Sequence, residues 1–445
     1  MGARIPVFIE LCSAAMARFF YSVVFSLLIP VILIRLYLRA RKAPAYGERW
    51  LERFGIFKVK DNKASEQNEA IWFHTVSVGE FIAAVPLIEQ VMAAFPDKPM
   101  VITTTTPTGS DQVKKRFANE LGKGLTHVYL PYDLPWFLSA FLRRVRPQLL
   151  VILETELWPN LIHSCQKHGT RVLVANARLS EKSAKGYGKL AKLSKQMLGN
   201  IDCLAVQNTT DGQRFTKLGM PDENMVVTGS IKFDLSIKQE LLQQGKDWRE
   251  QWGAKRKVVL VASTHQGEDD IALHAFKSVL KQDDSALLIV VPRHPERFDQ
   301  VASLIESQGL NLARRSLEPE INAGTQVLLV DTMGELMQFL AASDVCIMGG
   351  SYVENGGHNP LEPAALSLPI LMGPSQFNFA LICEQLEEAG GLLTVESEQL
   401  ADALTLWLKD DAIRKHKGLQ AKQVVDANRG AKQRVFELIK SQLTH

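Results

Sequence analysis

The chain has 445 residues, a length that suggests about three domains at roughly 150 residues each. Its composition, 46% hydrophobic and 22% charged, is that of an ordinary globular protein and excludes a disordered or collagen-like chain. The net charge of +3 gives no global basic excess that would favour a nucleic-acid partner. The five cysteines form no CxxC pair, which excludes a disulfide-rich secreted scaffold and a cysteine zinc site and favours a reducing compartment.

The N-terminal region joins an apolar run to a basic segment. Residues Phe19–Leu38 are almost entirely apolar, and twenty residues in a helix span ~30 Å, about one hydrocarbon core of a bilayer. Residues 35–60 carry eight Lys or Arg and two acids, and basic residues after an apolar segment mark the cytoplasmic side and attract anionic lipids. We therefore predict an uncleaved membrane anchor with the body in the cytoplasm. Pro30 and Arg35 leave open a helix that lies in the interface, and a helix that only packs on the body is the alternative.

Beyond the anchor, short apolar and β-branched runs alternate with helical patterns, which indicates buried, mostly parallel sheets. A polar helical stretch without strand character separates two series of strands. We predict an α/β fold with two doubly wound, Rossmann-like domains that face a cleft. The predicted organisation is an anchor and basic segment over residues 1–42, a first domain over 43–234, a linker over 235–256 and a second domain over 257–445. The predicted strands are Ile71–Val76, Met100–Thr105, His127–Leu130, Leu149–Leu153, Val172–Ala175, Cys203–Val206, Val226–Thr228, Val258–Ala262, Ala286–Val291, Val327–Val330, Val345–Met348 and Pro369–Met372. The predicted helices include Phe81–Phe95, Leu134–Val145 and the tail over residues 398–442.

Ionisable residues gather directly after these strands, where doubly wound sheets bind their ligands. Glu80 follows the first strand and a turn of small residues, and it falls at a helix start that stabilises its negative charge. There it could accept a proton from an attacking hydroxyl, or it could serve only as a helix-start acid.

Further along the first series, Glu154 and Glu156 flank the end of a strand, just before a helix that begins near Pro159. One of the two carboxylates could face the ligand while the other caps the helix. Lys232 follows the last strand of the first series, where it could meet a phosphate or carboxylate, or could simply be solvated.

The second series carries residues suited to a nucleotide. Arg293 lies between two prolines at a strand end, a restrained position that suits fork-like binding of a phosphate, with a structural salt bridge as the alternative. The turn Asp331–Glu335 leads into a helix whose free N–H groups can bind an anion or a base edge.

A glycine-rich loop follows the strand Val345–Met348. Residues 349–357 hold four glycines, which let the backbone approach a ligand closely. Asn359 then suits a helix N-cap, and Pro360 and Glu362 suit the first helical turn. We predict a phosphate cradle with a nearby carboxylate for ribose hydroxyls, since a plain turn does not explain the whole arrangement.

Several common site motifs are absent from the sequence. There is no GxGxxG after the first strand and no GxxxxGK[ST], so a nicotinamide dehydrogenase and a P-loop are poorly supported. There is no HExxH, and the ten His are scattered, which argues against a zinc site. No Asp-x-Asp follows a strand, so a divalent ion that bridges a diphosphate is not indicated.

Together, eight stretches of this sequence resemble the bacterial Kdo transferases (3-deoxy-D-manno-oct-2-ulosonic acid transferases) of lipopolysaccharide assembly. They run nearly from end to end of the chain, without a departure at the motif positions. The matching stretches are Arg41–Tyr46, Ser77–Glu80, Thr106–Ser110, Tyr129–Asp133, Glu154–Asn160, Asn176–Ser180, Pro292–Arg297 and Asn359–Glu362.

The resemblance implies a GT-B glycosyltransferase at the bacterial inner membrane. The donor would be CMP-Kdo, and the acceptor would be a lipid A precursor, an acylated and bisphosphorylated disaccharide (lipid IVA). By motif, Glu80 resembles the catalytic base, and Glu154 and Lys232 resemble transition-state stabilisers. Residues implied in CMP binding are Pro292, Arg293, Met333, Gly334, Glu335, Asn359, Pro360, Leu361 and Glu362. No metal is expected, because this donor carries a single phosphate.

Other functions remain open at this point. Another membrane-associated GT-B transferase or a sugar-nucleotide epimerase would use the same kind of nucleotide loops, and a catalytically dead nucleotide-sugar-binding scaffold is the non-enzyme alternative. The three intact ionisable residues Glu80, Glu154 and Lys232 argue against the last of these. The sequence fixes neither the number of Kdo residues transferred, nor the acceptor's acylation, nor the oligomeric state.

Overall fold

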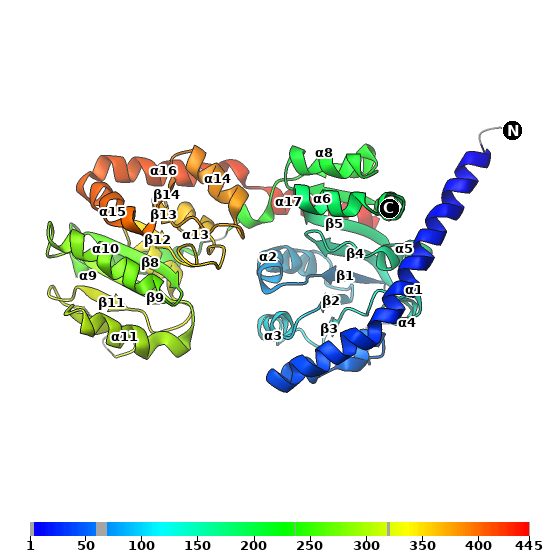
Figure 1. The fold of residues 1–445 in the computed structure, drawn as a ribbon, viewed down its shortest axis with the longest axis horizontal. Helices are drawn as coiled ribbons and strands as arrows, with labels where there is room; N and C mark the ends of the chain where they lie inside the picture. Colours follow the sequence, from blue (N-terminus) through cyan, green and yellow to red (C-terminus); the bar gives the residue numbers. More distant parts are fainter. Residues whose placement is uncertain (1–3, 59–68, 236, 318–320, 445) are drawn as a thin grey trace. The chain divides into compact units, whose positions relative to one another are not determined.

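The computed structural model describes residues 4–58, 69–235, 237–317 and 321–444 (Figure 1). The chain divides into two compact units, one formed by residues 1–231 with 430–445 and the other by residues 232–429. Each unit is built around a seven-stranded sheet in which all paired strands are parallel. Two Rossmann-like α/β units therefore confirm the predicted fold class.

The first unit has the strand order β3-β2-β1-β4-β5-β6-β7. This order reverses direction between β1 and β4, which creates a switch point at which ligands of such sheets bind. Its strands are β1 (Ala70–His74), β2 (Met100–Thr104), β3 (Leu125–Tyr129), β4 (Pro147–Leu153), β5 (Arg171–Ala177), β6 (Cys203–Val206) and β7 (Met225–Val227). Its helices are α1 (Arg4–Lys42), α2 (Val78–Ala94), α3 (Pro107–Arg116), α4 (Pro135–Val145), α5 (Pro159–Lys167), α6 (Glu181–Gly188), α7 (Ala191–Leu198), α8 (Thr209–Lys217) and α17 (Ala431–Thr444).

Both faces of this sheet are buried, as continuous apolar strands require. In β1, Trp72 joins the core cluster beneath α4 and α5, while Ile71 and Phe73 join the cluster beneath α2 and α17. Alternate side chains of one strand therefore enter two separate cores, and the helices cover both sides of the sheet (Figure 1).

The second unit has the order β10-β11-β9-β8-β12-β13-β14, with its own reversal between β8 and β12. Its strands are β8 (Val258–Thr264), β9 (Leu287–Pro292), β10 (Leu312–Arg314), β11 (Val327–Leu329), β12 (Val345–Met348), β13 (Ile370–Met372) and β14 (Leu392–Thr394). Its helices are α9 (Gln239–Trp252), α10 (Glu268–Leu280), α11 (Phe298–Ser307), α12 (Leu336–Ala341), α13 (Leu361–Ala365), α14 (Ala380–Glu388), α15 (Leu400–Lys409) and α16 (Asp411–Asn428).

All twelve predicted strands are present, with ends that differ by up to two residues, but β10 and β14 were not predicted. The predicted domain ends also need correction. The C-terminal helix α17 belongs to the first unit, not the second, because Val435 and Ile439 are buried in the core that α2 covers.

The predicted linker over residues 235–256 is likewise a structural part of the second unit. It contains α9, whose Trp248 and Trp252 stack on Phe339 of α12 at centroid separations of 4.5 and 6.4 Å. A helix anchored by aromatic stacking is not a free connector.

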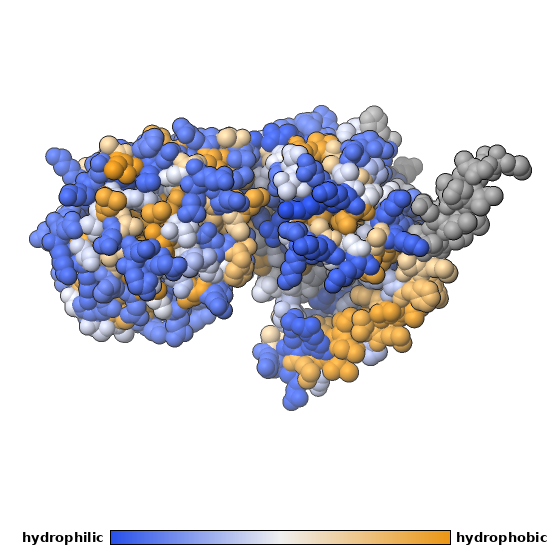
Figure 2. All heavy atoms as spheres, turned by 45° about the horizontal axis from the view of Figure 1, so that its top comes forward, coloured by the Kyte–Doolittle hydropathy of each residue, from blue (hydrophilic) through white to orange (hydrophobic). Residues whose placement is uncertain are grey.

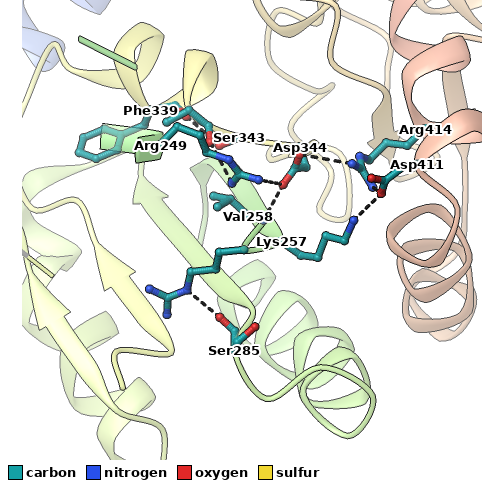
Figure 3. Close-up of polar contacts among 11 residues, drawn as sticks. Arg249, Lys257, Val258, Ser285, Phe339, Ser343, Asp344, Asp411 and Arg414 are labelled. Atoms are coloured by element: carbon teal, nitrogen blue, oxygen red, sulfur yellow. Dashed lines mark hydrogen bonds and ion pairs between the residues drawn. The ribbon is translucent and has the colours of Figure 1, made fainter. Parts of the chain in front are cut away.

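A charged network secures α9 and α16 to the start of the second sheet (Figure 3). Asp344 accepts hydrogen bonds from the Val258 backbone N–H at 2.8 Å and from Arg249 at 2.7 Å. Arg414 of α16 lies 3.5 Å from the other Asp344 oxygen and also binds Asp411, which pairs with Lys257. One carboxylate therefore joins β8, α9 and α16.

Replacing Asp344 with Ala is expected to lower the free energy of unfolding by about 2–3 kcal/mol, because hydrogen bonds to a charged group are lost and partly buried donors are left unpaired. Denaturant unfolding measures this change. Asp411→Ala is the matched control: its side chain is 55% exposed, so its ion pairs are worth at most about 1 kcal/mol. Equal effects of the two substitutions would contradict this account of the network.

The N-terminal helix α1 carries a large exposed apolar surface. Its residues Ala15–Lys42 form a helix that, by length and composition, could cross a membrane. Phe20 is 62% exposed and Leu27 is 73% exposed, and Figure 2 shows this surface as an orange band along α1. Apolar exposure on this scale indicates a membrane or another apolar partner.

One stretch of α1 also packs on the first unit. Ser22 exchanges hydrogen bonds with the Asn160 amide at 3.0 and 3.3 Å, and Tyr21 hydrogen-bonds to Asp133. Asp133 lies after β3, is 4% exposed, and accepts the N–H groups of Asn160 and Leu161 at 3.1 and 2.7 Å. It thereby caps the N-terminus of α5 from a distant part of the chain. Burial raises the Asp133 pKa to about 6, although these hydrogen bonds oppose the rise.

Candidate functional site

Three carboxylates meet at the switch point of the first sheet. Glu80 follows β1, and Glu154 and Glu156 follow β4, the neighbouring strand at the reversal. All three are half-buried, and their charges act on one another: Glu154 raises the pKa of Glu80, and both raise the pKa of Glu156. The structure thus brings together two of the predicted catalytic residues and adds a third carboxylate.

The start of α2 fixes the Glu80 side chain. Its two carboxylate oxygens accept the Val76 backbone N–H at 2.8 Å and the Ser77 hydroxyl at 2.9 Å. Ser77 in return accepts the Glu80 backbone N–H at 3.2 Å, so the pair resembles a capping box. Burial raises the Glu80 pKa above its usual value despite these hydrogen bonds. The structure therefore shows Glu80 as a helix-start acid held in place with a raised pKa, and its role as a general base stays a prediction.

Glu154 adopts an unusual backbone conformation. Its φ is +58°, in the left-handed region that residues other than glycine rarely occupy. Its N–H is bonded to the Ala175 carbonyl at 2.9 Å, and its carboxylate lies 3.5 Å from Arg178 Nε. Strain held by surrounding contacts is common at functional sites. The geometry is therefore consistent with the role that the resemblance implies for Glu154.

Of these three carboxylates, Glu156 is the one whose pKa is raised most strongly. Burial, followed by the charge of Glu80, raises its pKa to about 7, while a hydrogen bond from Trp158 opposes the rise. Glu156 therefore does not serve as the helix cap that the sequence left open, since Asp133 holds the α5 N–H groups. The spacing Glu-x-Glu at a strand end was the signal for it.

Glu156→Gln is expected to stabilise the fold at pH 8 by on the order of 1 kcal/mol, after allowing for solvent screening, and to change little at pH 4. The sign follows from linkage. The Glu156 carboxyl has a pKa of about 7 in the folded state and 4.5 in the unfolded state, so the folded state becomes less stable as the pH rises from 4.5 through 7. Thermal unfolding at several pH values measures the difference. Glu69→Gln, at an exposed position, is the control.

Lys232 lies in the short 3-10 turn η4 (Ile231–Phe233), where the chain leaves the first unit. The turn begins from a fixed point, since the Ile231 N–H donates to Asn176 Oδ1 at 3.1 Å. Asn176 itself has a φ of +57°. The Lys232 side chain is half-buried and is therefore not the freely solvated lysine of the alternative.

In the second unit, Pro292 ends β9 and Arg293 follows it. The Arg293 N–H is bonded to the Thr264 carbonyl at 3.0 Å, while its side chain is exposed. The backbone is therefore fixed as predicted and the guanidinium is presented outward. The structural ion pair in this loop belongs instead to Arg297, which binds Asp269 and the Thr264 carbonyl.

The turn of Met333, Gly334 and Glu335 lies after β11. Met333 is 61% exposed and Gly334 has a φ of +90°. Glu335 binds Arg315 at 3.0 Å and the Thr332 hydroxyl, and although burial opposes this, these partners hold its pKa below the usual value. The following helix α12 has only six residues.

Asn359, Pro360, Leu361 and Glu362 form the start of α13. Asn359 Oδ1 accepts the Leu361 N–H at 3.2 Å, so Asn359 caps this start although the helix itself begins at Leu361. Burial raises the Glu362 pKa, while a hydrogen bond from Asn359 and the charge of Arg293 oppose the rise. Two residues predicted to bind CMP, Arg293 after β9 and Glu362 in the segment after β12, therefore lie close in space.

The predicted phosphate cradle of the glycine-rich loop needs correction. Glu268, which is 2% exposed, accepts the N–H groups of Gly350, Ser351 and Tyr352 at 2.7, 3.0 and 3.0 Å. Other loop N–H groups, those of Asn355, Gly356, Gly357 and His358, are bonded to Val353, Ser375, Gly350 and Gly349 respectively. These seven N–H groups are held by Glu268, Ser375 and backbone carbonyls of the loop, and they are therefore not free to cradle a phosphate.

Two features of this region were missed from the sequence. Glu268 holds the loop from α10, and His265 lies beside His358. The segment that carries them, Ser263–Glu268, directly follows a predicted strand, and this was the available signal. Among the described residues, no group of three or more His, Cys, Asp or Glu is arranged to hold a metal ion.

Comparison with known proteins places these sites in a family. Residues 48–235 match the family described as 3-deoxy-D-manno-octulosonic-acid transferase (kdotransferase), and residues 246–424 match glycosyl transferases group 1. The 3-deoxy-D-manno-octulosonic acid transferase of Haemophilus influenzae is 40% identical over 430 residues, 96% of this chain and 99% of the relative. That of Bordetella pertussis is 32% identical over 435 residues, 96% of this chain and all of the relative (100%).

A solved structure shows the same fold at low identity. The UDP-GlcNAc 2-epimerase of Neisseria meningitidis, bound to UDP-GlcNAc, is 12% identical with a TM-score of 0.54 over 84% of this chain and 100% of that one. This likeness supports the GT-B architecture alone. The family matches themselves lead to one conclusion: the chain belongs to the 3-deoxy-D-manno-octulosonic acid (Kdo) transferases, glycosyltransferases of lipopolysaccharide synthesis.

Proposed function

We propose that this protein transfers Kdo from CMP-Kdo to lipid IVA, the acylated and bisphosphorylated lipid A precursor, and releases CMP. The observation that carries this proposal is the carboxylate cluster at the first switch point, in a chain that its relatives match over nearly their whole length. Glu80 is fixed in position and has increased basicity, as a general base requires.

In this reaction the acceptor hydroxyl gives its proton to Glu80 as its oxygen attacks the anomeric carbon of Kdo. The bond from that carbon to the phosphate oxygen breaks, and its electron pair stays on CMP. The anomeric carbon gains positive charge, which the carboxylate of Glu154 stabilises, and the leaving phosphate gains negative charge, which Lys232 and Arg293 stabilise.

The proposed site of action is the cytoplasmic face of the bacterial inner membrane. The exposed apolar surface of α1 would hold the protein at the bilayer, and its last turn carries Arg39, Arg41 and Lys42. These cations suit anionic lipids and the phosphates of the acceptor. The enzyme would therefore meet its lipid acceptor without the acceptor leaving the membrane.

Incubation with CMP-Kdo and lipid IVA in detergent micelles, followed by mass spectrometry, tests the proposal. The expected result is a mass increase of one or more Kdo units on the lipid, with release of CMP. Transfer from UDP-GlcNAc but not from CMP-Kdo would replace the proposed donor. Binding of CMP-Kdo without any product would favour the scaffold alternative.

Chelation is expected to leave the transfer rate unchanged within about twofold. CMP-Kdo has one phosphate, whose charge a few cationic side chains can match, so no metal is needed to bridge a diphosphate. The measurement is the initial rate after treatment with EDTA, compared with a sample to which Mg²⁺ has been restored. A loss of activity that Mg²⁺ reverses would contradict metal-independent transfer.

A further inference from the structure

Two histidines lie at the switch point of the second sheet. His265 follows β8, and His358 lies in the loop after β12, the neighbouring strand at which the strand order reverses. The crevice at such a reversal is where doubly wound sheets bind nucleotides. The backbone there is tightly packed: Ser263 has a φ of +57°, and a Cβ on Gly349 would lie 2.6 Å from the Ser263 carbonyl oxygen.

The two imidazoles are directly paired. Their Nε2 atoms lie 2.9 Å apart, and the rings are nearly parallel, with centroids 5.1 Å apart and planes within 10°. Asn355 Nδ2 lies 2.8 Å from His265 Nε2. When His358 Nε2 carries the hydrogen, His265 Nε2 is the acceptor, and the Asn355 amide shares the single lone pair of that nitrogen. Two neutral rings can hold this arrangement.

The charged groups around the pair come from the turn after β9 and from α10. From this turn, Arg293, His294 and Arg297 act on the pair, and from α10, Glu268 acts on His265. Burial, followed by the charges of its neighbours, lowers the His358 pKa to about 4. Burial, together with the charges of Arg297 and Arg293, lowers the His265 pKa, while the charge of Glu268 opposes this fall. The positive neighbours thus help to keep both rings neutral.

An anion at this position would reverse that balance. A phosphate beside Arg293 would offset the cationic field and favour an imidazolium. The loop N–H groups from Gly350 to Tyr352 are already bonded to Glu268, which favours side chains as donors to this phosphate. The imidazole pair is one cluster of such side chains at the switch point.

We propose that His265 and His358 are further donor-site residues: when the phosphate of the donor binds beside Arg293, the pair takes up one proton from solvent, and an imidazolium N–H donates a hydrogen bond to that phosphate. As the bond from Kdo to the phosphate oxygen breaks, the electron pair stays on the phosphate, where this N–H stabilises it. When CMP leaves, the proton returns to solvent. This inference rests on the proposed CMP-linked donor.

Titration calorimetry with CMP tests the proposal on the full-length enzyme. Binding heats measured at pH 7.5 in two buffers of different ionisation enthalpy give the protons taken up per CMP, and at this pH free CMP is mostly the dianion because its second pKa is about 6. We expect net uptake of up to one proton by the wild type. His265→Asn and His358→Gln should abolish it and weaken binding, by about tenfold for a lost charged hydrogen bond.

His274→Gln is the matched control, since His274 lies exposed on α10 close in sequence to Glu268. It should retain both affinity and proton uptake. If a pair variant fails to fold, ¹⁵N NMR of the wild-type histidines replaces it, and the expected change on CMP addition is from neutral to imidazolium signals. CMP binding without proton uptake or imidazolium signals would overturn the proposal. A wild type that does not bind CMP would instead overturn the proposed donor.

Discussion

Replacing Glu80 with Gln is expected to reduce Kdo transfer by at least ~100-fold while CMP binding is retained. The amide keeps an oxygen that can accept the Val76 N–H, so the start of α2 should survive, but it cannot take a proton from the acceptor hydroxyl. Loss of the Glu80 charge also removes a cause of the raised Glu156 pKa. The measurement is kcat/KM for transfer to lipid IVA, with CMP affinity measured separately.

Glu89→Gln provides the matched control on the same helix. Glu89 pairs with Arg116 on the surface, with a side chain 39% exposed, and its substitution should leave the rate close to that of the wild type. Retention of more than a tenth of the wild-type rate by Glu80→Gln would rule out a general-base role. The remaining function of Glu80 would then be that of a helix cap.

Asp133→Ala is expected to lower the free energy of unfolding by about 3 kcal/mol. The substitution leaves the buried N–H groups of Asn160 and Leu161 and the Tyr21 hydroxyl without their acceptor. For a unit of about 250 residues this corresponds to a fall in Tm of about 6 °C. The start of α5, and with it the adjoining loop of Glu154 and Glu156, should loosen.

Ser22→Ala tests the contribution of α1 to this contact separately from that of Asp133. It removes the hydrogen bonds from α1 to the Asn160 amide, together with a local bond from the Ser22 hydroxyl to the Arg18 carbonyl, so we expect a loss of about 1 kcal/mol. Thermal unfolding in detergent measures both variants. If Asp133→Ala were no more destabilising than Ser22→Ala, the carboxylate would not be the cap of α5.

Whether a strand could be predicted from the sequence depends on the length and composition of its apolar run. Seven-residue strands such as β4 and β8 are continuous apolar runs that only a doubly covered sheet can bury. The missed strands β10 and β14 have three residues each and contain no Val or Ile, unlike the equally short strands β7, β11 and β13, which were predicted. Each missed strand pairs with its neighbour at a sheet edge.

Site residues could likewise be predicted only where the signal is local in the sequence. Glu80, Glu154 and Arg293 could be found because each follows a strand, and parallel strands place their carboxyl ends at one edge. The occupation of the glycine-rich loop by Glu268 could not be found, because it joins residues more than eighty positions apart. The pairing of His265 with His358 is hidden in the same way.

The sequence by itself determined the apolar N-terminal helix, the two α/β units and the family, because these follow from local periodicity and from contiguous motifs. Only the tertiary structure decided that α17 completes the first unit, that Asp133 caps α5, and that Glu156 joins the carboxylates at the first switch point. It also decided that Glu268 occupies backbone N–H groups of the glycine-rich loop. The physical reason is that pKa values and hydrogen-bond partners depend on burial and on neighbours brought together by folding, which no local stretch of sequence contains.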